Sequence, residues 1–145
     1  MNTKRWVITS LVVFVVSQIL DYVIHGVILA GAYQATAMLW RPMEEMMSMM
    51  WMMWVSGLVF SFIFVFVFAK GYEGKGIWEG LRFGLLMGVF FGVPMSLGTY
   101  ASMPITAGIA WGWFIYGVIE MALLGIIAAL LYKPAAAPVS KTAAA

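Results

Sequence analysis

An aspartate and a histidine stand four residues apart inside the first long apolar run of the chain. On a helix this spacing places Asp21 and His25 on successive turns of one face, where a carboxylate and an imidazole can pair. At about 100° per residue, Ser17 and Gln18 fall on the same polar arc. Because a charged group in mid-bilayer costs about 2.5 kcal/mol or more, we expect this face to point toward protein or water.

Glu120 supplies a second carboxyl inside the last apolar run. At about 1.5 Å of rise per residue from the flanking charges, it falls near the bilayer centre, with Asp21 about one turn further out and His25 beyond it. The three side chains could hydrogen-bond to one another and join two helices, or they could relay a proton or an ion. The residue types are compatible with both interpretations.

Methionines crowd the segment from residue 43 to residue 53. A thioether and an imidazole together resemble a Cu(I) ligand set and a haem axial pair, which makes His25, Met46 and Met50 the candidate metal ligands. The methionines cover every side of the expected helix, however, whereas a ligand site would use one side. This pattern favours a pliable packing surface, and we expect neither a metal nor another cofactor.

The polar arc lacks the arrangement of a nucleophilic active site. Ser17, Asp21 and His25 lie on consecutive turns of one helix and project side by side, so they do not converge as a nucleophile and its base must. We therefore expect a protein that is not an enzyme.

The composition predicts an integral membrane protein, because 64% of the residues are hydrophobic and only 10% are charged. The net charge of +2 comes from scattered basic residues rather than a cluster, which argues against a nucleic-acid partner. The chain has no cysteine, so it has neither disulfides nor thiolate metal sites.

Four apolar runs, each long enough to cross a bilayer, predict an all-α bundle of four transmembrane helices. A short uncharged segment, Gly31–Trp40, is expected to lie at the membrane interface between the first two helices. We expect one membrane domain over residues 1–133 and a flexible low-complexity tail over residues 134–145. The expected helices cover about residues 6–30, 42–69, 80–100 and 109–132.

Glycines recur every four residues at the start of the third apolar run. On a helix, Gly80, Gly84, Gly88 and Gly92 form one ridge almost free of side chains, on which another backbone can approach closely. Four glycines in register would be costly without such a neighbour. The ridge predicts a packing seam for a neighbouring helix or for a sister subunit, rather than a phosphate-binding loop.

The basic residues are distributed unequally between the two sides of the expected bundle. Only Arg41 falls on the side of the first and third connections, and two glutamates follow it closely. Because positively charged loops stay in the cytoplasm, both termini are predicted to be cytoplasmic, in the cytoplasmic (inner) membrane. The basic residues on the cytoplasmic side are Lys4, Arg5, Lys70, Lys75, Arg82, Lys133 and Lys141.

The stretch from Glu79 to Tyr132 resembles the second half of small uncharacterised four-helix bacterial inner-membrane proteins, a domain-of-unknown-function family. It shares their glycine-rich helix, a proline near its outer end (Pro94), a short outer loop and a final helix rich in small residues. The first half is similar only in layout, because that family has an aromatic Trp-Tyr-Gly-Pro-like stretch where this chain has His25-Gly26. The resemblance implies the four-helix fold and no particular activity.

These observations predict a non-enzymatic packing or accessory protein of the membrane, surrounded by lipid and associated with itself or with other membrane subunits. A first alternative is a small proton-coupled transporter or channel that uses Asp21, His25 and Glu120. A second alternative is a protein that binds a cofactor, a lipid or a quinone through His25.

Overall fold

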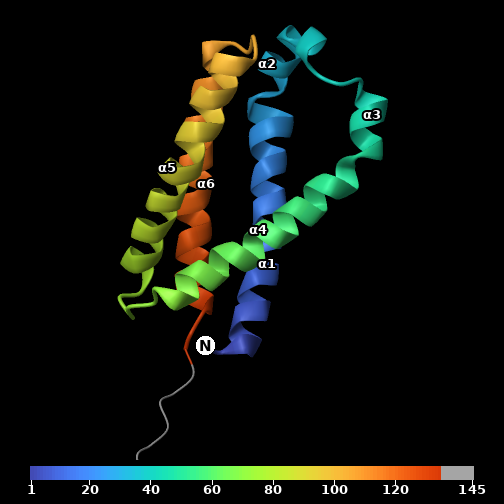
Figure 1. Cartoon of the computed structure of the whole chain (residues 1–145). Helices are drawn as coiled ribbons and strands as arrows, with labels where there is room; N and C mark the ends of the chain where they lie inside the picture. The colour runs from blue at the N-terminus through green and yellow to red at the C-terminus, as the bar shows by residue number, and fades with distance from the viewer. Residues whose placement is uncertain (135–145) are drawn as a thin grey trace, which may run out of the picture.

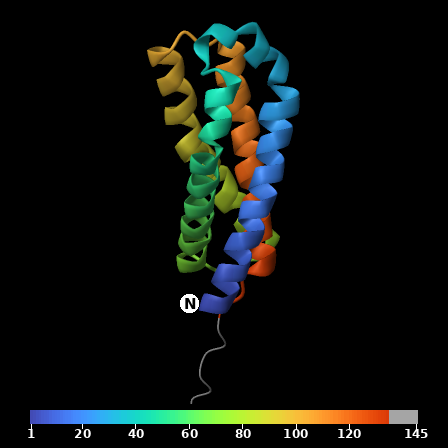
Figure 2. The same cartoon turned by 90° about the vertical axis from the view of Figure 1, so that its right-hand side faces the viewer.

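The computed structural model describes residues 1–134, and these residues form helices and connections without a strand. Four of the helical stretches are long and apolar enough to cross a membrane, which confirms the prediction of an all-α, multi-pass membrane protein. The four stretches form an elongated bundle (Figure 1, Figure 2). The helical elements are α1 (Thr3–Asp21), the π-helix η1 (Tyr22–Ile28), α2 (Ala30–Ala35), the 3₁₀ turn η2 (Ala37–Leu39), α3 (Met43–Ser48), α4 (Met50–Lys70), α5 (Ile77–Ser102) and α6 (Ala107–Leu131).

Two of the four expected helices differ from a single α-helix. The first changes from α to π geometry after Asp21. The second is divided at Met49 into α3 and α4. Directly before that break, the Ser48 hydroxyl donates a 2.7 Å hydrogen bond to the Glu45 carbonyl, and such a side-chain bond competes with the backbone hydrogen bonds of a helix. The expected flexible tail lies, except for Pro134, outside the described residues.

The glycine ridge of α5 lies against α6 of the same chain. A Cβ atom at Gly80 or Gly84 would overlap the α6 backbone, and one at Gly88 would lie 2.8 Å from the Cα atom of Val118. On the facing side, a Cβ at Gly125 would overlap the backbone of α5 in turn. The close approach is therefore reciprocal, and α6 fills the groove in which the sequence also allowed a sister subunit.

Helix α4 crosses α1 obliquely, and its first turns stand away from the other helices (Figure 1). The second half of α4 contributes Phe64, Val65 and Phe68 to an apolar core near the end of the bundle that holds the N-terminus. Val13 of α1 and Leu124 of α6 are buried in the same core. A second, smaller core surrounds Ile105, Ile109 and Ala110. On α6, Glu120 stands between Ile109 of the second core and Leu124 of the first, and Asp21 and His25 stand between Val13 of the first core and Tyr33, which packs against the second.

Candidate functional site

The π-helix η1 begins directly after Asp21 and carries His25 in its middle. It ends where the Leu29 N–H donates a 2.9 Å hydrogen bond to the Ile24 carbonyl, five residues back. Such wide turns inside a helix are uncommon and occur frequently at functional sites. After Leu29 the chain continues into α2, which brings Tyr33 back onto His25.

His25 joins two side chains through its two ring nitrogens. Its Nδ1 atom is 2.6 Å from the Tyr33 hydroxyl, and its Nε2 atom is 4.0 Å from Oδ1 of Asp21. The Tyr33 oxygen also accepts a 2.6 Å hydrogen bond from Nε1 of Trp113. Because an indole N–H can only donate, the Tyr33 proton is free to go to Nδ1 of His25, and the neutral imidazole then carries its own proton on Nε2, facing Asp21.

Aromatic rings hold Tyr33 in place. Its ring stacks on His25, with centroids 6.0 Å apart and an interplanar angle of 18°, and Trp40 meets it edge-on at 5.3 Å. Nε1 of Trp40 donates to the Thr36 hydroxyl at 3.0 Å. Burial raises the pKa of the Tyr33 hydroxyl, although the hydrogen bond from Trp113 acts in the opposite direction. The hydroxyl therefore keeps its proton at neutral pH.

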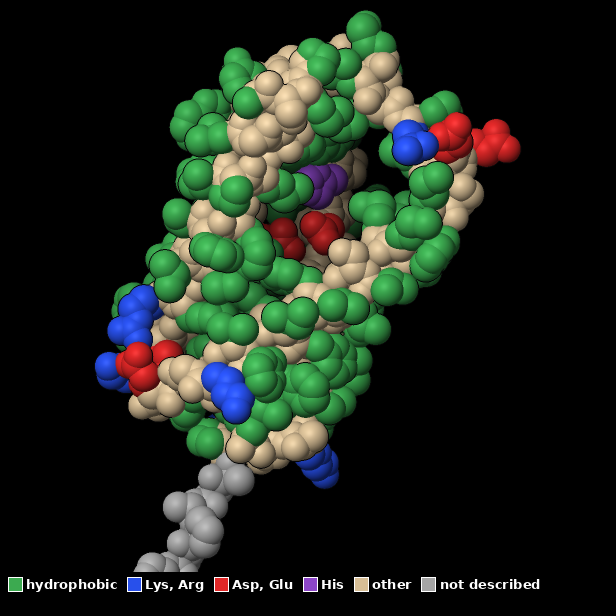
Figure 3. All heavy atoms as spheres, in the orientation of Figure 1, with side chains coloured by type: hydrophobic (Ala, Val, Ile, Leu, Met, Phe, Trp, Pro, Cys, Tyr) green, Lys and Arg blue, Asp and Glu red, His purple; other side chains and the backbone are tan. Residues whose placement is uncertain are grey.

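Glu120 is buried on α6, with 7% of its surface exposed, and its carboxyl interacts electrostatically with that of Asp21. By contrast, the side chains of Asp21 and His25 are 50% and 43% exposed. Figure 3 shows the only histidine of the chain and two acidic side chains in a hollow beside the first half of α4. We name the residues Asp21, His25 and Glu120 the acid–histidine cluster, and the opening beside them the lateral hollow.

Two polar residues expected on the same face are used elsewhere. The Ser17 hydroxyl donates to the carbonyl of Phe14 at 2.9 Å, within its own helix. The Gln18 side chain lies against Gly57 of α4. A Cβ atom added to Gly57 would be 2.9 Å from Nε2 of Gln18.

The sequence did not assign Tyr33, Trp40 and Trp113 to the site. Their aromatic character indicated positions at headgroup depth, which did not link any of them to His25. The hydrogen bonds between them depend on the π-helix and on the return of α2, and neither feature has a periodic signal in the sequence.

The candidate metal ligands do not form a preformed site. Both nitrogens of His25 already face Tyr33 and Asp21, and among residues 1–134 no three His, Asp or Glu side chains are grouped to hold a metal ion. Met46 lies on α3 and Met50 at the start of α4, in the part of the chain that stands away from α1 (Figure 1). The methionines therefore border an opening rather than converge on His25.

No protein-family profile, curated protein or solved structure matches this chain. The resemblance of α5 and α6 to small four-helix bacterial membrane proteins therefore stays a prediction. The geometry of the cluster is the observation that bears on function.

The lateral hollow is closed toward the end of the bundle that holds the N-terminus. There Val13, Val65 and Leu124 are fully buried and Phe64 is 1% exposed. These apolar side chains fill the space between α1, α4 and α6, and the hydroxyl residues Thr9, Ser10 and Ser61 are fully buried on the same helices. The acid–histidine cluster is thus accessible from one side, and a path through the bundle requires a movement of these helices.

Proposed function

We propose that the protein is a non-enzymatic subunit of the cytoplasmic membrane, with both termini in the cytoplasm, that associates with further copies of itself or with a larger membrane complex through the lateral hollow. The observation that carries the proposal is the half-exposed Asp21–His25 pair at the end of a membrane-spanning stretch. A charged or strongly polar pair that faces lipid is costly, and a polar group of a neighbouring subunit would remove that cost.

The packing of α5 and α6 also supports the lateral hollow as the surface for association. Because α6 occupies the glycine ridge of α5, the ridge has no room for a second subunit. The outer face of α5 carries large apolar side chains, such as Leu86 and Phe90, each 66% exposed, and lipid solvates these well. The lateral hollow is the place where lipid solvates the surface poorly.

Cysteine cross-linking tests this proposal, since the natural chain has no cysteine. Tyr22 lies next to Asp21, one turn after Gln18, and is 70% exposed. We expect the Tyr22→Cys variant to form a cross-linked product in native membranes, either a dimer or a larger adduct. Phe90→Cys, on the outer face of α5, is the matched control and should remain at monomer size. Equal cross-linking of both variants, or of neither, would contradict the proposal.

A proton-coupled transporter is the second candidate, because the Tyr33 hydroxyl, hydrogen-bonded to His25, adds a further group that can exchange a proton to the acid–histidine cluster. A chain of groups that can exchange protons is what a relay requires. The closed apolar core around Val13 and Phe64 argues against a permanent channel. Transport would need α4 to move, and a pH-driven flux in liposomes would be its direct evidence.

A further inference from the structure

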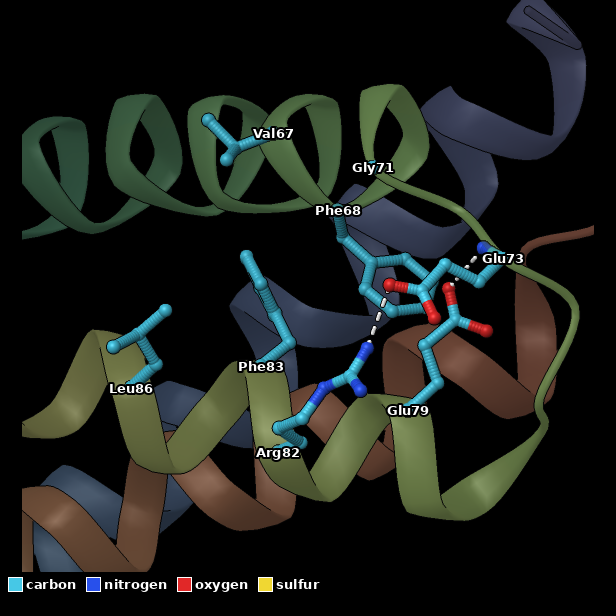
Figure 4. A pocket seen from close by; sticks show the side chains of 8 residues that line it. All are labelled: Val67, Phe68, Gly71, Glu73, Glu79, Arg82, Phe83 and Leu86. Carbon is cyan, nitrogen blue, oxygen red and sulfur yellow. Dashed lines mark hydrogen bonds and ion pairs between the residues drawn. The ribbon is translucent and has the colours of Figure 1, made fainter.

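A pocket lies at the end of the bundle that holds the N-terminus, between the end of α4 and the start of α5 (Figure 1, Figure 4). Its volume is about 400 Å³. The wall has two chemically different parts. Glu73, Glu79 and Arg82 form the polar part, and Val67, Phe68, Phe83 and Leu86 form the apolar part.

The polar part is held by a short loop. Glu79 is buried, and its two carboxylate oxygens accept hydrogen bonds from the backbone N–H groups of Glu73 and Lys75, at 2.6 and 2.8 Å. Gly74 and Gly76 have φ angles of +78° and +68°, a conformation that favours glycine. Glu79 therefore acts as the anchor of the loop, and its charge is already satisfied by the backbone.

Arg82 faces the pocket with unused hydrogen-bonding capacity. One guanidinium nitrogen, Nη2, is 2.7 Å from Oε1 of Glu73, and the other Glu73 oxygen pairs with Lys75 at 2.5 Å. A guanidinium has five N–H groups, and a phosphate group can accept two of them at once. Glu73 thus occupies one of the positions that an external anion would take.

Charged side chains of both signs meet at the pocket. Arg82 lies in its wall and Lys75 pairs with Glu73, whereas Glu73 and Glu79 are the carboxylates that oppose these two basic groups. An anion that displaces Glu73 would gain both basic groups as partners. Hydrogen bonds from Lys75 and Arg82 lower the pKa of Glu73 to about 2, so this carboxylate is ionised at neutral pH. Because Glu73 also has Lys75 as a partner, it can release Arg82 without losing every counter-ion.

The apolar part determines what kind of anion fits. Phe83 and Leu86 follow Arg82 on α5, toward the middle of the membrane-spanning stretch, and Val67 of α4 lies opposite them (Figure 4). A free phosphate would leave this part of the pocket empty. A phosphate that carries an acyl chain would fill both parts, with its charge at the membrane boundary and its chain along the helices.

We propose that this pocket binds an anionic phospholipid, with the phosphate on Arg82 and Lys75 and one acyl chain against Phe83 and Leu86. The lipid phosphate takes the place of Glu73 on the Arg82 guanidinium. Glu73 then acts as an internal competitor for the headgroup. This site does not depend on the lateral hollow or on the proposed association.

Native mass spectrometry of the full chain in a neutral detergent tests the site. The probes are phosphatidylglycerol, phosphatidylcholine and inorganic phosphate. We expect phosphatidylglycerol to be retained in preference to phosphatidylcholine. Arg82→Gln should lose about five-fold in phosphatidylglycerol affinity, the change that one basic residue near an anionic headgroup makes. Glu73→Gln should gain affinity, because the competing carboxylate is gone.

Two further variants separate this proposal from general electrostatics. Arg5→Gln removes a basic residue at the same end of the bundle but outside the pocket, and it should bind phosphatidylglycerol as the natural chain does. Leu86→Trp obstructs the apolar part and should weaken lipid binding while Arg82 is intact. Arg82→Lys keeps the positive charge and controls for a folding defect. It should have the melting temperature of the natural chain and keep part of the affinity for phosphatidylglycerol.

Three results would overturn the proposal. The first is that Arg82→Gln binds phosphatidylglycerol as tightly as the natural chain does. The second is an equal loss in Arg5→Gln, which would indicate a general charge effect. The third is displacement of the lipid by inorganic phosphate at the same concentration, which would show that the acyl chain contributes nothing.

Discussion

The α5–α6 seam and the α1–α4 side of the bundle meet the membrane in opposite ways. Along the seam, glycines bring two backbones together, and the surface that remains outside is apolar. On the α1–α4 side, α4 leaves the bundle beside a half-exposed aspartate and histidine (Figure 3). The seam therefore stabilises the folded chain, whereas the other side has polar groups that the chain alone does not cover.

The largest effect is expected from a large side chain in the seam. In Gly84→Leu the new side chain would overlap the backbone at Met121 and Ala122, so the two helices must separate. Overpacking commonly costs about 1–3 kcal/mol, and a clash with backbone lies at or above the upper limit. Leu85→Ala, on the exposed neighbouring face, is the control and should change little. Thermal unfolding in detergent measures both, and equal stability would mean that the seam does not hold the bundle together.

A smaller loss is expected on the other side when the Tyr33 hydroxyl is removed. Tyr33→Phe leaves Nδ1 of His25 and Nε1 of Trp113 without their partner, and at a partly exposed site such a hydrogen bond contributes about 0.5–1.5 kcal/mol to stability. Tyr100→Phe, at a residue that is 49% exposed on α5, is the matched control. Thermal unfolding followed by tryptophan fluorescence distinguishes them. An unchanged melting temperature in Tyr33→Phe would show that this network does not stabilise α2 against α6.

Amide substitutions in the acid–histidine cluster should affect folding least and separate the two candidate functions best. Asp21→Asn and Glu120→Gln keep hydrogen-bonding groups and remove a carboxyl from the membrane, so we expect stability within about 1 kcal/mol of the natural chain. Asp21→Leu should weaken association more than Asp21→Asn, because His25 loses its polar partner. Folded amide variants in which a measurable proton flux of the natural chain disappears would instead support transport.

The smallest effect concerns pH at the loop that carries Glu73. Hydrogen bonds from Lys75 and Arg82 lower the pKa of this carboxyl from 4.5 to about 2. Because the folded-state pKa is the lower one, its stabilising contribution is complete above the unfolded value and disappears as the pH falls through about 2. Carboxyl chemical shifts in the natural chain should therefore show no titration of Glu73 between pH 5 and pH 3, and a midpoint near 4.5 would contradict the ion pairs.

The sequence predicted the structural features that follow from a repeating pattern of residues. It predicted less well the features that depend on one local backbone geometry. The spacing of Gly80, Gly84 and Gly88 defines one helix face, and the structure shows which neighbour it meets. Gly125 on the facing helix was not recognised as its counterpart, because a lone glycine among small residues has no period. Helix lengths followed from the apolar runs, since the bilayer thickness limits them.

The site was harder to predict. The i, i+4 spacing of Asp21 and His25 predicted their pairing, but the π-helix that turns His25 toward Tyr33 is a local backbone geometry that no spacing of residue types indicates. The departure of α4 likewise depends on tertiary packing, because its methionine-rich beginning is apolar on every side. Whether such a surface meets lipid, a neighbouring helix or a partner is not encoded in its periodicity.

The central claim is that a partner covers the lateral hollow in the native membrane. A nitroxide spin label at Tyr22→Cys tests it most directly, through collisions with oxygen, which concentrates in lipid, and with a water-soluble nickel chelate. In discs of native lipid, we predict low accessibility to both reagents, and a rise in accessibility after the complex is dissociated in detergent. High accessibility to oxygen in native lipid, or to the nickel chelate, would contradict the claim, because the hollow would then be open to lipid or to water.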